Sequence, residues 1–118
     1  MLKNALVTVF VTDFDRAVRF YTETLELKLT ERHQDHWAQV TGAGITIGLH
    51  PAGADGLPSD PNRGMSIGFN VDDLDAARSA LRAKGVEFTG ESTEAPVHLA
   101  HFTDPDGTPL YLCQQVGF

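Results

Sequence analysis

Histidine is the residue type in this chain most able to do chemistry, because an imidazole can bind a metal ion or transfer a proton near neutral pH. Two pairs are spaced three residues apart, His33 with His36 and His98 with His101, and His50 stands alone. On a helix this spacing places both side chains on one face, but in a β-strand it places them on opposite faces. The surrounding residues favour strands, so we expect neither pair to bind a metal ion together.

General acid–base catalysis is the second chemistry open to these residues. His101 is a candidate general base if the fold brings it near the Tyr111 hydroxyl, with His50 or His36 as proton donor or electrostatic partner. The only cysteine, Cys113, has no basic neighbour in the sequence that would activate its thiol, so we interpret it as a packing residue. The sequence contains no Cys-x-x-Cys, no His-Glu-x-x-His and no phosphate-binding glycine loop. The catalytic residues stay unassigned at this point, with His101 and Tyr111 as the candidates.

The elements that must position these residues come in two copies. The segment 11–17 (VTDFDRA) matches 71–77 (VDDLDAA), with every position displaced by sixty residues. A period of half the chain indicates two related modules rather than a solenoid of many repeats.

Each copy has the pattern βαβββ. An apolar, β-branched run is followed by an aspartate that resembles a helix N-cap, Asp13 in the first copy and Asp72 or Asp73 in the second. Apolar residues then recur at helical spacing, and Gly85 is expected to end the second helix. The connections Gly42-Ala43-Gly44 and Asp104-Pro105-Asp106-Gly107 are turn signals. We expect the first helix to bury Phe14, Ala17, Val18, Tyr21 and Leu25, and the second helix to bury Leu74, Ala77, Ala80 and Leu81. The strands are expected at 5–11, 27–32, 36–41, 45–50, 66–71, 86–89, 97–103 and 109–115.

The length of 118 residues suits one domain. We expect a single domain over 1–118, with modules at 1–50 and 65–118. The connecting loop 51–64 holds three Pro and three Gly, and a rim or lid and a plain connector are equally open readings of it. One module exposes a sheet face that it cannot bury alone, so the modules must pair within the chain or between two chains. A homodimer is a reasonable expectation.

Composition narrows the possible partners. The net charge is −7 and no basic run occurs, which argues against nucleic acid. The apolar run Ala5 to Val11 is too short to span a membrane, and Met1-Leu2-Lys3 lacks the pattern of a secretory signal. With a single cysteine, we expect a cytoplasmic protein. The acidity would suit a cationic ligand, although caps and turns explain many of the acidic residues.

In this order and spacing, the motifs resemble the vicinal oxygen chelate superfamily, which includes glyoxalase I, extradiol dioxygenases and bleomycin-resistance proteins. The resemblance covers nearly the whole chain and implies an α+β fold in which two tandem βαβββ modules form a curved mixed-sheet cup. It implies little about the reaction, because this superfamily hosts many chemistries. The motifs that carry it are Val11-x-Asp13-x-Asp15-Arg16-Ala17-x-x-Phe20-Tyr21, Val71-Asp72-Asp73-Leu74 and Phe102-Thr103-Asp104-Pro105-Asp106-Gly107.

Metal-dependent members of that superfamily place one ligand, His or Glu, on each of four strands. The matching positions here are Leu6, Gly48, Ser66 and Tyr111. Leucine and glycine side chains cannot ligate, and a neutral serine or tyrosine is a poor donor. We therefore expect no metal ion and no other cofactor.

The same resemblance predicts a binding cup. If Gly48 and Tyr111 face the cup, alternation along the strands places His50 and His101 there as well, and His36 is expected to lie beside His50. Trp37 would then point toward the helix and stack on a ligand only in the opposite register, because a slip of one residue flips every assignment. The predicted polar contacts are His36, His50, Ser66, His101 and Tyr111, and the predicted walls are Thr8, Phe10, Leu99 and Cys113.

Three functions follow from these observations. The first is a metal-independent, small-molecule-binding protein that resembles the drug-sequestering bleomycin-resistance proteins. The second is a glyoxalase-like lyase or isomerase acting next to a carbonyl, either metal-free or with a displaced metal site built from His36, His50 and His101. The third is an interaction domain whose cup is filled by its own side chains.

Overall fold

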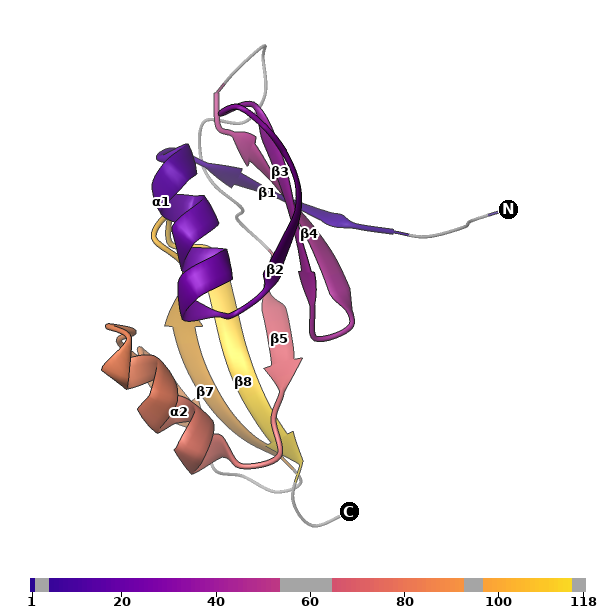
Figure 1. Cartoon of the computed structure of the whole chain (residues 1–118). Helices are drawn as coiled ribbons and strands as arrows, with labels where there is room; N and C mark the ends of the chain where they lie inside the picture. Colours follow the sequence, from indigo (N-terminus) through magenta and orange to yellow (C-terminus); the bar gives the residue numbers. More distant parts are fainter. Residues whose placement is uncertain (2–4, 54–64, 93–96, 116–118) are drawn as a thin grey trace. The chain divides into compact units, whose positions relative to one another are not determined.

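A computed structural model describes residue 1 and residues 5–53, 65–92 and 97–115 of this chain. The chain divides into two compact units, Met1–Arg63 and Gly64–Phe118, and each is described by itself (Figure 1). Each unit is a four-stranded mixed sheet with one helical segment on it. The predicted α+β class and the two tandem βαβββ modules are confirmed.

Unit 1 has its strands in the order β1-β4-β3-β2, with β1 parallel to β4 and the other pairs antiparallel. Its helix continues into a short π-helical turn, η1. The elements are β1 (Val7–Val11), α1 (Phe14–Arg19), η1 (Phe20–Thr24), β2 (Lys28–His33), β3 (Trp37–Gly42) and β4 (Ile45–Pro51).

Unit 2 repeats this topology in the order β5-β8-β7-β6. The prediction of a strand at 86–89 is wrong, because this segment begins with the end of the preceding helix. The N–H of Val86 donates to the Leu81 carbonyl, and the Val86 side chain is buried. The strand begins later, at Gly90. The elements are β5 (Ile67–Asn70), α2 (Leu74–Ala83), β6 (Gly90–Ser92), β7 (Val97–Thr103) and β8 (Pro109–Gln115).

Both helices begin at the predicted kind of cap. A side-chain oxygen of Asp13 accepts a hydrogen bond from the N–H of Arg16, and Asp73 accepts from Ala76, each at 3.1 Å. Each bond satisfies a backbone donor that the first helical turn leaves unpaired. Gly85 ends the second helical segment with φ = 94°, a left-handed conformation that glycine adopts without strain.

The core of each unit lies between its helix and one face of its sheet. In unit 1, buried residues alternate along the strands, and α1 contacts β4 over this face. The helix α2 contacts β7 and β8 but buries only Leu74, so the expected burial of Ala80 is wrong: Ala80 is exposed. The buried sheet residues are Val9, Val11, Ala38, Val40, Ile47 and Leu49 in unit 1 and Ile67, Ala100, Phe102, Leu110 and Leu112 in unit 2.

The turn between β3 and β4 sets the register of the whole hairpin. Gly42 pairs with Ile45, so only Ala43 and Gly44 form the loop, with φ angles of 53° and 78°. Positive φ at both loop residues is the mark of a type I′ turn, which matches the twist of paired strands. The sequence predicts a three-residue connection, 42–44, so the true register differs by one residue. Gln39 consequently pairs with Gly48 and Ala38 with Leu49.

Candidate functional site

Each sheet has a second face, turned away from its helix, which we call the far face. In unit 1 its side chains alternate with the buried core residues along β1, β3 and β4, and most are half-buried. This face combines rings, hydroxyls and an amide. Its members are Thr8, Phe10, Trp37, Gln39, Thr41, Thr46, Gly48 and His50.

One end of this far face is a cluster of three rings. The imidazole of His50 lies between Phe10 and Trp37, with ring centroids 6.0 Å and 6.2 Å apart and edge-to-face geometry at both contacts. Its Nδ1 lies 2.9 Å from the Pro51 carbonyl oxygen. Because a carbonyl can only accept, Nδ1 carries the hydrogen, and Nε2 of the neutral ring is a hydrogen-bond acceptor.

The indole of Trp37 lies over Gly48 on the neighbouring strand. A Cβ atom added at residue 48 would collide with the six-membered ring of the indole. The indole N–H donates to the side-chain oxygen of Gln39 at 3.1 Å, which fixes the orientation of the ring. The expectation that Trp37 points toward the helix is therefore wrong, and the two-residue turn at Ala43–Gly44 is the reason.

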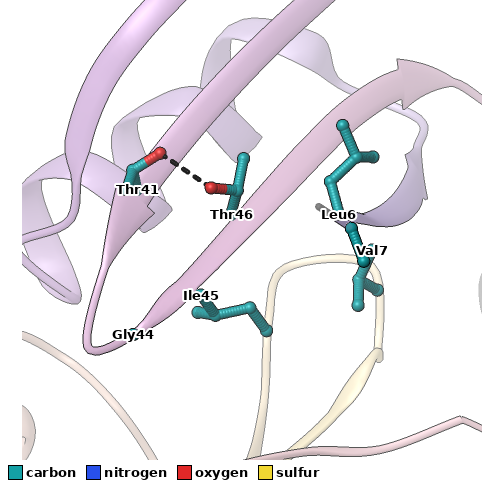
Figure 2. Close-up of a pocket in the computed structure, with 7 residues that line it drawn as sticks. Leu6, Val7, Thr41, Gly44, Ile45 and Thr46 are labelled. Atoms are coloured by element: carbon teal, nitrogen blue, oxygen red, sulfur yellow. Dashed lines mark hydrogen bonds between the residues drawn. The ribbon is translucent and has the colours of Figure 1, made fainter. Parts of the chain in front are cut away.

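An open pocket of about 470 Å³ lies at the other end of the sheet, where residues of the far face meet Val7 and Ile45, which alternation along the strands places on the helix side. The hydroxyls of Thr41 and Thr46 face each other at 3.2 Å across the hairpin, and Leu6 lies beside Thr46 (Figure 2). Leu6 is 44% exposed, so its side chain is accessible to a ligand. Aliphatic walls with a pair of hydroxyls are typical of a small-molecule pocket. The lining residues are Ala5, Leu6, Val7, Thr41, Gly44, Ile45 and Thr46.

Unit 2 has a related far face with a different ring. Tyr111 lies over Gly68, where an added Cβ would collide with the phenol. His101 pairs with Tyr111 across β7 and β8, with ring centroids 5.8 Å apart. A smaller pocket of about 270 Å³ lies beside Cys113. Its other lining residues are Asn70, Val71, Asp72, Gln114 and Gln115.

The structure gathers most of the predicted site residues on these two faces. Thr8, Phe10 and His50 lie on the far face of unit 1, and Leu99, His101, Tyr111 and Cys113 lie on that of unit 2. Whether they contact a ligand stays a prediction.

Two predicted residues lie elsewhere. The expectation that His36 lies beside His50 is wrong: His36 is exposed in the turn after β2, where its N–H donates to the His33 carbonyl. Ser66 is exposed just before β5, within a Gly-x-Ser-x-Gly sequence at 64–68. The nucleophile elbow with that motif turns from a strand into a helix, whereas Ser66 leads into a strand.

Sequence reasoning missed three parts of unit 1: the indole of Trp37, the amide of Gln39 and the pocket around Leu6. One signal for the first of these is present in the sequence. Gly48 interrupts the β-branched and aliphatic run of β4, and a glycine inside a strand often marks a close approach by another group.

The four family positions do not fit a metal ion. Leu6 has no donor atom, the space beside Gly48 is filled by the indole, and the Tyr111 ring packs on Gly68. Within residues 5–53, 65–92 and 97–115, no three His, Cys, Asp or Glu side chains come together as a ligand set. Among these same residues, no helix is long and apolar enough to cross a membrane.

Comparison with known proteins finds one matching family model and relatives of similar sequence and fold. The model of the Glyoxalase/Bleomycin resistance protein/Dioxygenase superfamily matches residues 4–111. A "Probable lactoylglutathione lyase" from Vibrio parahaemolyticus serotype O3:K6 (strain RIMD 2210633) is 29% identical, over 88% of this chain and 84% of that protein.

Two solved structures illustrate the range of relatives. TnmS3, an antibiotic binding protein from Streptomyces sp. CB03234, is 29% identical with a TM-score of 0.75, covering 98% of both chains. The fosfomycin resistance protein FosX from Listeria monocytogenes has a TM-score of 0.79 at 16% identity, covering 98% of this chain and 95% of its own. This second likeness concerns the fold alone.

Proposed function

This chain belongs to the Glyoxalase/Bleomycin resistance protein/Dioxygenase superfamily, and we propose that within it the chain is a small-molecule-binding protein that works without a metal ion. It would sequester its ligand, as bleomycin-resistance-type proteins do, rather than convert it. The observation that carries this proposal is that the indole of Trp37 covers Gly48, the position at which the resemblance to metal-dependent members leads us to expect a glutamate ligand. A carboxylate there would bind a metal ion, whereas an indole offers a large apolar contact surface.

Two further observations support a binding protein. The far face of unit 1 joins rings, hydroxyls and an amide in the mixture that is usual for small-molecule pockets. The antibiotic binding protein TnmS3 is 29% identical to this chain over nearly its full length.

The experiment is a parallel test of binding and turnover on the full chain. Bleomycin A2 and a panel of drug-like molecules would be tested by equilibrium dialysis, and each bound molecule would be recovered and identified by mass spectrometry. We expect saturable binding of at least one panel member and its recovery unchanged. A panel without any binder, or recovery of a converted product, would overturn the proposal.

A second candidate function is a lyase or isomerase acting next to a carbonyl. It is favoured by the 29% identity to the probable lactoylglutathione lyase and by the pairing of His101 with Tyr111. In this alternative His101 is the general base. Formation of S-lactoylglutathione from glutathione and methylglyoxal, lost in His101→Ala with folding preserved, would support the enzyme over the binder.

We also propose a cytoplasmic homodimer. Cys113 is the only cysteine and cannot form a disulfide within the chain, which suits a reducing compartment. One βαβββ module exposes a sheet face that needs a second module to cover it, and a second copy of the chain is one way to supply it. Light scattering coupled to size exclusion would give twice the 12.8 kDa chain mass, whereas a monomer mass would refute the dimer.

A further inference from the structure

We propose that the far face of unit 1 binds a planar organic cation, with its ring system stacked on the Trp37 indole and an aliphatic substituent in the pocket beside Leu6. This inference rests on the proposed small-molecule binding and names the ligand class and the half of the molecule that receives it.

A planar ligand follows from the way the indole is held. One face of the Trp37 ring lies against the backbone of Gly48, so the opposite face is turned away from the sheet. The bond to Gln39 and the edge contact with His50 hold the ring in place before any ligand arrives. A rigid aromatic surface loses little conformational entropy on binding, and offset stacking with another ring is its preferred contact.

The positive charge follows from the groups that surround the indole. The face of an indole attracts cations through its quadrupole. Glu31 on β2 pairs with Gln39, so its carboxylate projects from the same face beside the ring, where it contacts His33 at 3.2 Å. His50 contributes a hydrogen-bond acceptor at Nε2 when neutral.

Lysine and arginine side chains on the strands of unit 1 lie away from this end of the face, whereas His33 pairs with Trp37 and contacts Glu31, and carries a positive charge only when protonated. The described strands of unit 1 carry one arginine, Arg32, and one lysine, Lys28. Arg32 pairs with the core residue Ala38, so its side chain leaves the sheet on the helix side. Lys28 pairs with Thr41, at the pocket end of the far face. The net charge of −7 adds a weaker, long-range attraction for cations.

The distance along β4 sets the size of the ligand. His50, at the ring cluster, lies four residues after Thr46, at the pocket, which corresponds to about 13 Å of strand. Two or three fused rings with a short substituent span this length. The substituent would contact Leu6 and could donate to, or accept from, the Thr41 and Thr46 hydroxyls (Figure 2).

Proflavine, a flat tricyclic cation, is the probe, and 9-anthracenecarboxylate, a flat tricyclic anion of similar size, is its control. Trp37 is the only tryptophan, so quenching of its fluorescence reports binding, while equilibrium dialysis of every variant measures the affinity and locates the site. We expect saturable quenching by proflavine and at least tenfold weaker binding of the anion. Trp37→Leu should weaken proflavine about tenfold, and Glu31→Gln about two- to fivefold, because the carboxylate is half-exposed.

Two controls keep the result interpretable. Glu87→Gln removes an exposed carboxylate in unit 2 and should leave the affinity unchanged. Glu31→Gln alters only a surface side chain, so it tests the charge even if Trp37→Leu folds poorly.

Equal binding of the two tricycles, or proflavine affinity unchanged in both Trp37→Leu and Glu31→Gln, would overturn this inference. If other molecules bind the chain while proflavine does not, this inference fails and the proposed function stands. If nothing in the wider panel binds either, both fail.

Discussion

The six-membered ring of Trp37 occupies the space in which a side chain at residue 48 would begin, so Trp37 and Gly48 form one interlocked pair across β3 and β4. Residue 48, where the resemblance to metal-dependent members leads us to expect a glutamate, is therefore covered by an aromatic ring. Unit 2 builds the same relationship from Tyr111 and Gly68, across β8 and β5.

We predict that Gly48→Ala destabilises the protein by about 1–3 kcal/mol, because the new methyl group displaces a packed ring. The emission maximum of Trp37 should shift at the same time, since the ring leaves its contact with the strand. Urea unfolding and fluorescence spectra measure the two effects. Gly90→Ala is the matched control, because a Cβ there meets open space. Equal stability of the two variants would contradict the interlocked pair.

The second prediction concerns Gly68, whose substitution by alanine should cost a similar amount, about 1–3 kcal/mol, through collision with Tyr111. In a Tyr111→Ala background the cost should fall by at least half, because the colliding ring is gone. A double-mutant cycle measured by urea unfolding gives this coupling. A cost independent of Tyr111 would show that glycine is needed at residue 68 for another reason.

Helix capping provides a third prediction, with a neighbouring residue as control. Asp73→Ala should destabilise the protein by about 1 kcal/mol, because the N–H of Ala76 loses its acceptor. Asp72 is also exposed but does not accept this bond, so Asp72→Ala should stay within about 0.5 kcal/mol of the parent. The reverse order in chemical denaturation would assign the cap to Asp72.

A fourth prediction concerns the turn between β7 and β8. The Oδ1 atom of Asp104 accepts from the N–H groups of Asp106 and Thr108 at 2.9 Å and 2.8 Å, and Asp104 is only 3% exposed. Asp104→Ala should cost about 2–4 kcal/mol, because both donors lose that partner. Asp104→Asn retains a carbonyl oxygen and should cost less than half as much. Similar unfolding midpoints for the two variants would show that the acceptor is not what stabilises this turn.

Metal content gives a fifth prediction. Protein purified without a histidine tag, exposed to zinc, nickel, cobalt and iron and then dialysed, should contain well under one metal ion per chain by elemental analysis. The reason is that Leu6, Gly48, Ser66 and Tyr111 supply no adequate donor set. About one metal ion per chain, lost in His50→Ala or His101→Ala, would instead favour a displaced site and the lyase alternative.

The elements of the fold could be predicted because their signals are local. The sixty-residue repeat, the aspartate caps and the turn at Asp104–Gly107 depend on residues close in the sequence. The pairing of His101 with Tyr111 was also predictable, because that turn fixed the register correctly. The strand at Gly90–Ser92 was not, because tertiary packing of Val86 decides where the chain leaves α2.

The site depended on a smaller detail. A two-residue turn and a three-residue turn both suit Gly42-Ala43-Gly44, yet they differ by one residue in register and so exchange the two faces of β3. The two-residue turn places Trp37, instead of His36, beside His50 on the far face.

By itself, the sequence determined the two βαβββ modules and the aspartates able to cap their helices, because these depend on residue type and local spacing. Only the tertiary structure decided that Trp37 covers Gly48 beside His50, and that Leu6 and the two threonines form a pocket at the other end of the same face. The physical reason is that side chains alternate across a strand, so the residues that meet are set by cross-strand register, which the backbone conformation of Ala43 and Gly44 fixes.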